Sequence, residues 1–193
     1  MNRSEVTLQK VLGQDCFYEI WESPFDSARL ERSAAHRDDL REARREAEKA
    51  QARLYAARQS GADLEYLDSL LFGARMLDYA AWRYLNALEI AERWQQIAAD
   101  FQPENFWHEF DSEVIYQSHS RLVDMMDSIT SLREMYRRVW LAEYAPYRLG
   151  TTLGRFDAEY EFWRRLQSRF RNAARGLSDK TALPRLETVV GGR

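Results

Sequence analysis

Apolar residues recur every three or four positions along four long stretches of this chain, a spacing that places them on one face of an α-helix. Ser23 before Pro24 predicts an N-cap followed by a proline in the first turn of the first stretch, which covers about residues 25–59. Opposite charges three apart on its outer face indicate contact with solvent. Small side chains, which let a neighbouring helix approach closely, dominate its inward positions: Leu40, Ala43, Ala47, Ala50, Leu54 and Ala57.

The second stretch follows the turn residues Ser60 and Gly61 and begins near Ala62, with Asp63 in its first turn. A turn this short predicts that the two helices are antiparallel. Gly73 lies within the helix and lowers its stability by roughly 1 kcal/mol relative to alanine, which predicts that another backbone or a large aromatic side chain packs against it. The apolar positions are Leu64, Leu67, Leu71, Ala74, Leu77, Ala81, Leu85, Leu88, Ala91 and Trp94.

Residues 101–111 form the longest predicted connection, and their three phenylalanines and one tryptophan predict that it packs over one end of the bundle. A third helix is predicted from Ser112 to Tyr144, Pro146 marks a sharp turn, and a fourth helix runs from Leu149 to Phe170. At 1.5 Å per residue the first three predicted helices are each roughly 45 to 55 Å long. Matched lengths favour side-by-side packing. The predicted fold is all-α, an up-down bundle of about four long antiparallel helices.

One bundle domain is predicted over residues 24–176, because the helix-breaking residues Gly61, Pro103 and Pro146 fall between the periodic stretches and not at a domain boundary. An irregular N-terminal arm over residues 1–23 precedes the domain. A flexible tail over residues 177–193 follows it, since Pro184 and the glycines near the end of the chain interrupt any regular pattern there.

Charge and composition narrow the classes of partner. The chain has 28 Lys and Arg against 31 Asp and Glu, a formal net charge of −3, and it therefore lacks the basic excess of a nucleic-acid-binding protein. Its one cysteine, Cys16, is interpreted as a small core residue. No stretch approaches the roughly 18 consecutive apolar residues of a membrane span, and the first residues lack the apolar centre of an export signal. We expect a soluble protein of unassigned localisation.

No sequence signature of nucleophilic, zinc or nucleotide chemistry is present. His36, His108 and His119 lie on three different segments, so neither a metal ion nor another cofactor is predicted. Asp157 and Glu161 share a helical face, but neighbouring arginines favour ordinary surface ion pairs over an acid–base pair.

The densest group of aromatic and charged residues lies where the third helix turns into the fourth. Its aromatic rings could stack on a sugar, and its glutamate and arginine could hydrogen-bond sugar hydroxyls. The alternative, which the helical spacing of the aromatic residues favours, is a packed corner in which Gly150 and Gly154 allow close approach and Glu143 pairs with an arginine. The candidate ligand-binding residues are Trp140, Glu143, Tyr144, Tyr147 and Arg148.

Two segments, ARMLDYAAWRYLNALEIA (residues 74–91) and WLAEYAPYRLGTTLGRFDAEYEFW (residues 140–163), resemble the helical region that follows the catalytic barrel in bacterial glycosidase-like proteins related to the family-20 β-N-acetylhexosaminidases. The resemblance spans about residues 20–175 and lies in the spacing of aromatic and charged residues. Those enzymes use an adjacent Asp-Glu pair on a barrel strand, and this chain contains no Asp-Glu dipeptide. The resemblance implies an accessory bundle that buttresses a barrel and helps to wall its substrate cleft.

Two functions from different classes remain open at this stage. The first is a non-catalytic accessory domain of a carbohydrate-active protein, with a catalytic barrel and a carbohydrate as its partners. The second is a stand-alone bundle for interaction or homo-oligomerisation, which the charged, alanine-striped first helix suggests. We do not expect the chain to be an enzyme by itself, and glycoside hydrolysis by a larger parent protein is implied only by the resemblance.

Overall fold

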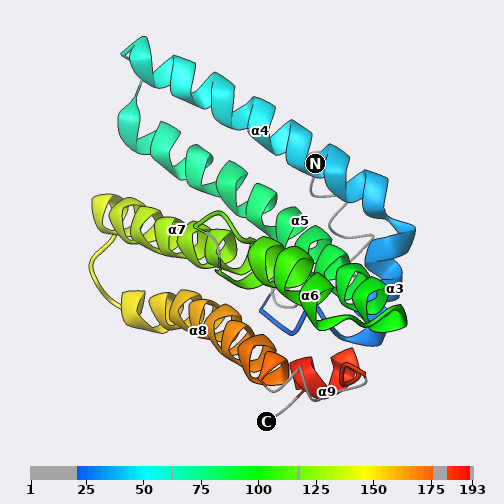
Figure 1. The fold of residues 1–193 in the computed structure, drawn as a ribbon. Helices are drawn as coiled ribbons and strands as arrows, with labels where there is room; N and C mark the ends of the chain where they lie inside the picture. The colour runs from blue at the N-terminus through cyan, green and yellow to red at the C-terminus, as the bar shows by residue number, and fades with distance from the viewer. Residues whose placement is uncertain (1–20, 62, 117, 176–181, 192–193) are drawn as a thin grey trace.

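The computed structural model describes residues 21–61, 63–116, 118–175 and 182–191, and every regular element within these ranges is helical. Helix α5 lies between α4 and α7, and α7 packs in turn against α8 (Figure 1). These long helices alternate in direction, which confirms the predicted all-α antiparallel bundle. In chain order the elements are α3 (Ser27–Ala35), α4 (Arg37–Gln59), α5 (Leu64–Ala99), α6 (Pro103–Asn105), the π-helix η1 (Phe106–Tyr116), α7 (Arg121–Glu143), α8 (Leu149–Ala174) and α9 (Leu186–Gly191).

The first predicted helix is broken in two at His36, whose φ of −116° and ψ of 26° lie outside the helical region. The N-cap of α3 is Asp26, whose carboxylate accepts a hydrogen bond from the backbone N–H of Arg29, so the predicted cap at Ser23 is wrong. The break allows α3 and α4 to take different directions (Figure 1). Phe25, just before α3, is thereby buried against the ring of Trp163 on α8.

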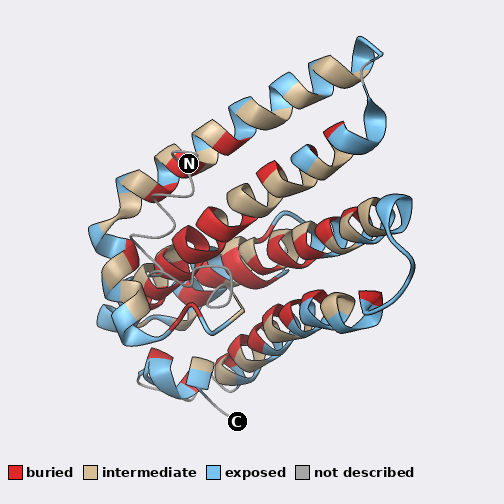
Figure 2. Cartoon of the chain, turned by 180° about the vertical axis from the view of Figure 1, so that it is seen from behind, coloured by how far each residue is buried: buried red, intermediate tan, exposed pale blue. Residues whose placement is uncertain are grey.

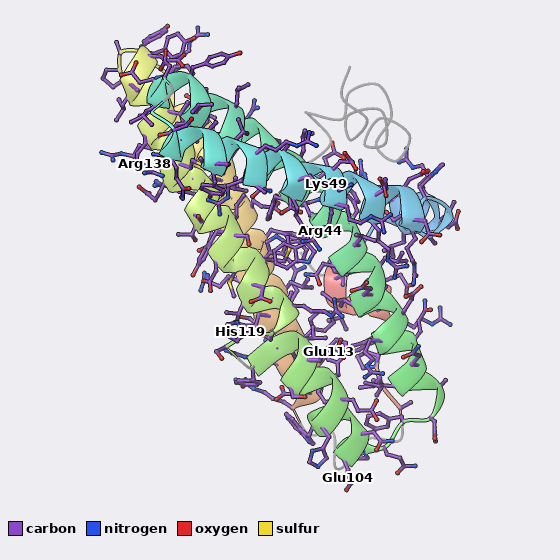
Figure 3. All side chains as sticks on the ribbon, turned by 90° about the horizontal axis from the view of Figure 1, so that it is seen from above. Arg44, Lys49, Glu104, Glu113, His119 and Arg138 are labelled. Atoms are coloured by element: carbon purple, nitrogen blue, oxygen red, sulfur yellow. The ribbon has the colours of Figure 1, made fainter. Side chains whose placement is uncertain are left out.

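Residues 101–111, which the sequence predicts to be a connection between helices, are mostly helical, and Phe106 and Phe110 within them are buried. Elements α6, η1 and α7 follow one another along one side of the bundle, from Glu104 to Arg138 (Figure 3). The wider turn of a π-helix brings side chains four residues apart nearly into line. Phe106, Phe110 and Val114 use this spacing and are fully buried. The predicted start of the third helix at Ser112 therefore lies inside η1.

The start of α5 agrees closely with the sequence. Asp63 is the N-cap, and its carboxylate accepts hydrogen bonds from the backbone N–H groups of Glu65 and Tyr66, both at 3.2 Å. These two bonds satisfy N–H groups that have no partner within the helix.

We expect Asp63→Ala to lower the free energy of unfolding by about 1 kcal/mol, because the two N–H groups lose their acceptor. Denaturant titration followed by circular dichroism measures the change. Asp63→Asn is the matched control and should retain most of the stability, since the asparagine oxygen can also cap the helix. An alanine variant as stable as the asparagine variant would contradict the capping role.

The three helical glycines singled out by the sequence do not mark close contacts. A Cβ atom added at Gly73, Gly150 or Gly154 would meet no atom within 4 Å, apart from the backbone of its own helix. The predicted close approach at these positions is therefore wrong. Large side chains fill the space beside α5 instead, as where the ring of Phe72 lies 5.4 Å from that of Tyr136.

Buried residues concentrate along α5 and on the inner faces of α7 and α8, with fewer on α4 (Figure 2). The alanine stripe of α4 is confirmed in its first half, where Ala43 and Ala47 are buried against α5. Beyond Ala47 no residue of α4 is fully buried. The distal half of α4 therefore contributes little to the core.

Helix α9 is an element that the sequence did not predict. Its Leu186 and Val189 are buried, and the guanidinium of Arg169 on α8 donates to the carbonyl oxygen of Val190 at 2.7 Å. Residues 1–20, which include most of the predicted N-terminal arm and Cys16, lie outside the described residues. Within the described ranges, no helix is both long enough and apolar enough to cross a membrane.

Candidate functional site

The five candidate residues lie together at the corner between α7 and α8. Helix α7 ends at Glu143, the N–H of Tyr144 donates to the carbonyl oxygen of Trp140 at 2.8 Å, and α8 begins at Leu149. Arg148 precedes α8 with a φ of +60°, and no other non-glycine residue among those described has a positive φ. A short turn thus brings the predicted residues to one end of the bundle.

A row of aromatic rings connects this corner to the core, and we call it the aromatic ladder: Phe156, Tyr136, Trp140 and Tyr144. Successive ring centroids are 5.6, 5.7 and 4.9 Å apart. Phe156 is buried, whereas Tyr144 is 58% exposed. The indole N–H of Trp140 donates to the carbonyl oxygen of Ala145 at 2.9 Å, which fixes the orientation of its ring.

The other candidate residues at the corner face solvent. Tyr147 is 72% exposed, and the guanidinium carbon of Arg148 lies 5.2 Å from the centroid of its ring. Glu143 accepts a hydrogen bond from the hydroxyl of Ser69 on α5 at 2.9 Å. The predicted pairing of Glu143 with an arginine is therefore wrong. The structure brings the five candidate residues together at one end of the bundle.

Exposed apolar side chains of α5 lie near the same end of the bundle, because the turn between α4 and α5 and the turn between α7 and α8 are on the same side (Figure 1). Leu64, Tyr66 and Leu70 are 51%, 63% and 42% exposed. Leu141 on α7 is 41% exposed. Clusters of exposed apolar residues are more often contact surfaces than isolated ones are.

The most polar group in the core is an ion pair that the sequence analysis missed. Arg83 on α5 and Glu159 on α8 are almost completely buried. The arginine Nε donates to Glu159 Oε1 at 2.6 Å, and its Nη2 donates to Oε2 at 3.0 Å. This two-pronged geometry is the strongest arrangement of an arginine and a carboxylate.

Two further side chains complete the ion-pair network. The hydroxyl of Tyr79 and the indole N–H of Trp163 both donate to Glu159 Oε1, at 2.9 and 2.7 Å. The rings of Tyr84, Phe162 and Trp163 lie within 6 Å of the Arg83 guanidinium carbon. The carboxylate is therefore saturated with donors and sealed from solvent. Its arrangement suits holding α5 and α8 together and leaves no lone pair facing a substrate.

Burial and charge shift the pKa values within this network. Burial lowers the pKa of Arg83, but the adjacent Glu159 charge and its hydrogen bonds outweigh burial and raise that pKa above the usual arginine value. Burial, and secondly the Glu159 charge, raise the pKa of Tyr79 well above the ordinary 10.0. Arg83 is thus charged and Tyr79 is protonated at neutral pH.

The raised pKa of Tyr79 predicts a loss of stability at alkaline pH. Below about pH 10 the tyrosine is protonated in both the folded and the unfolded chain, and above it the unfolded chain loses the proton first. The free energy of unfolding therefore falls as the pH rises. We expect Tyr79→Phe to make this fall less steep, as measured by denaturant titrations between pH 9 and 11. Tyr147→Phe is the matched control, and an equal slope in both variants would contradict the prediction.

A pair of spacings could have revealed the network. Tyr79 and Arg83 are four residues apart on α5, and Glu159 and Trp163 are four apart on α8, so each pair shares one helical face. The acidic residues singled out from the sequence are instead Asp157 and Glu161, the neighbours of Glu159. For those neighbours the surface interpretation is confirmed, because Asp157 pairs with Arg133 and Glu161 pairs with Arg164.

The histidines do not converge in the described part of the chain, where no group of three or more His, Cys, Asp or Glu side chains could hold a metal ion. His36 pairs with Asp39, and His119 lies 3.8 Å from Asp124.

Comparison with known proteins adds no relative. No protein family, no characterised protein and no solved structure matches the chain. The resemblance of residues 74–91 and 140–163 to a glycosidase-associated helical region therefore stays a prediction.

Proposed function

We propose that this chain is a non-catalytic helical accessory domain of a carbohydrate-active, glycosidase-like protein, with the α7–α8 corner facing the sugar at the edge of a catalytic barrel. The observation that carries the proposal is the exposed pair Tyr144 and Tyr147 at the end of the aromatic ladder. Exposed tyrosines offer large flat faces, and their hydroxyls provide hydrogen bonds at the rim. The resemblance, whose second segment (residues 140–163) includes this corner, supports the choice of carbohydrate.

The distribution of carboxylates supports a non-catalytic role. General acid–base hydrolysis of a glycoside needs two carboxyl groups that flank the scissile bond in a cleft. Glu159 is saturated by its donors, and Asp157 and Glu161 are each held by an arginine. Glu143, the carboxylate at the corner, is hydrogen-bonded to Ser69. These carboxylates are better suited to structural contacts than to acid–base catalysis.

A glycan array probed with the labelled chain tests the proposal. We expect the labelled chain to bind a subset of the glycans, and we expect the double variant Tyr144→Ala/Tyr147→Ala to lose this binding. The matched control is Tyr116→Ala/Tyr160→Ala, which removes one exposed tyrosine at the end of η1 and another in the middle of α8. A chromogenic N-acetylglucosaminide should not be turned over. Turnover by the purified chain, or retention of no glycan together with no association with a barrel-containing glycosidase, would overturn the proposal.

A specific observation favours the second candidate, an interaction or oligomerisation bundle. Leu64, Tyr66 and Leu70 expose apolar surface at the start of α5, next to the corner. Such a surface would be covered in a complex. Light scattering coupled to size exclusion tests for self-association. A mass equal to one chain at high concentration, with no protein captured through this end of α5, would count against this candidate.

A further inference from the structure

The α7–α8 corner carries several arginines that have no acidic partner within the described part of the chain, as is also true of surface arginines elsewhere, such as Arg53 and Arg165. Arg41, Arg45 and Arg164 each pair with a carboxylate one helical turn away, and Arg133 pairs across to Asp157 on α8. Four arginines near the corner are exposed and have no Asp or Glu within 4.0 Å among the described residues: Arg137, Arg138, Arg148 and Arg155.

The corner is therefore a local positive centre on a chain of opposite net charge. Residues 137–156 contain these four arginines and a single acidic residue, Glu143, whereas the whole chain has a formal net charge of −3. Arg138 projects from the outer side of α7 near this end (Figure 3). An unpaired guanidinium group is planar and can donate two parallel hydrogen bonds to the oxygens of a carboxylate or sulfate. Charge complementarity thus points to an anionic ligand.

The aromatic side chains of the corner are positioned before any ligand arrives. Tyr144 is supported by Trp140 at 4.9 Å, and the indole of Trp140 is fixed by its bond to Ala145. Arg148 adopts a left-handed conformation, which costs a non-glycine residue about 1 kcal/mol or more, and its guanidinium lies over Tyr147. Such preorganisation lowers the entropic cost of binding.

We propose that the α7–α8 corner binds an anionic oligosaccharide, with Tyr144 and Tyr147 stacking on pyranose rings and the unpaired arginines binding carboxylate or sulfate groups on those rings. The inference rests on the proposed carbohydrate function and specifies its ligand class. A nucleic acid fits less well, because it carries a phosphate at every nucleotide, a denser charge than one carboxylate per disaccharide, and a chain of net negative charge repels it more strongly. A lipid surface needs a broad apolar face, whereas the exposed side chains of residues 137–156 include four arginines and a glutamate.

Isothermal titration with a hyaluronan octasaccharide and with its carboxyl-reduced, neutral counterpart tests the proposal. The two probes share their rings and differ only in the carboxylates. We expect the acidic probe to bind at least ~5-fold more tightly, because exposed ion pairs are individually weak but several act together. Raising NaCl from about 50 to about 500 mM should remove most of this preference, since exposed charges are then screened.

A matched pair of charge variants locates the site. Arg138→Gln/Arg148→Gln should abolish the preference for the acidic probe, whereas Arg53→Gln/Arg165→Gln, which removes two other unpaired surface arginines, should leave it unchanged. If both double variants lost the preference for the acidic probe equally, that preference would depend only on net charge, and the inference would be overturned.

The remaining outcomes separate the inference from the proposed function. Equal binding of both probes, lost in Tyr144→Ala/Tyr147→Ala, would overturn the inference and leave the carbohydrate function standing. Binding of neither probe would overturn the inference, while the glycan array and barrel association would still decide the function. Tighter binding of phosphatidylserine vesicles or of oligo-dT than of the octasaccharide would overturn the inference in favour of a lipid or a nucleic acid.

Discussion

Glu159→Ala is expected to lower the free energy of unfolding by about 3–5 kcal/mol, because it leaves the Arg83 guanidinium buried without its counter-charge. The variant also removes the acceptor used by Tyr79, and it leaves the Trp163 indole N–H with only the Tyr79 hydroxyl, at 3.1 Å, as its acceptor. A loss of this size is a large share of the stability of an ordinary domain. Denaturant titration at pH 7 measures it directly.

The neighbouring carboxylate on the same helix is the matched control. Glu161 pairs with Arg164 on the surface, and Glu161→Ala should leave the stability within measurement error of the parent. The double variant Arg83→Met/Glu159→Leu should recover much of the loss, since apolar residues of similar volume can replace a buried ion pair. If Glu159→Ala were as stable as Glu161→Ala, the ion pair would not hold α5 and α8 together.

Trp94→Ala should cost a similar amount, about 3–5 kcal/mol, because it empties the centre of the aromatic cluster at the other end of the bundle. Trp94 is 1% exposed, and its ring lies 5.1 Å from Phe110 and 5.2 Å from Phe170. Its indole N–H also donates to the carbonyl oxygen of Pro184 at 3.0 Å, which ties the segment before α9 to α5. Thermal and denaturant unfolding measure the loss.

Trp107 is the matched control, because it is a tryptophan on the surface of the bundle. It lies on η1, is 47% exposed, and contacts Phe106 at its edge. Trp107→Ala should therefore cost much less than Trp94→Ala. Trp94→Phe separates the two roles of the buried tryptophan, since it keeps most of the packing and loses the bond to Pro184. Equal losses for the two alanine variants would contradict the assignment of the core.

The helical architecture could be predicted from the sequence because each long helix carries a continuous apolar stripe. The points at which the helices are interrupted could not be predicted. The break at His36 and the π-helix from Phe106 arise from tertiary packing, which places Phe25 and Phe110 in the core. Local helix propensity contains no term for such long-range burial. The N-cap at Asp63 was nearly located because the aspartate, the turn and the apolar pattern agree.

The candidate site was predicted less completely than the fold. The five candidate residues lie together at the α7–α8 corner because all of them fall within residues 140–148, around a single turn. The sequence did not reveal the Arg83–Glu159 pair, whose members are 76 residues apart in the chain. Charge spacing within one helix shows which side chains share a face. It does not show which face of another helix lies opposite.

The one-sided packing of α4 has a consequence for how the molecule fluctuates. Past Ala47 this helix buries no residue fully, and among the described long helices α4 packs against α5, so separating its last turns from α5 exposes little apolar surface. Amide hydrogens there should exchange with solvent through local fraying, at rates far above those set by global unfolding. The chain thus combines a slowly exchanging centre around α5 with a flank that opens independently.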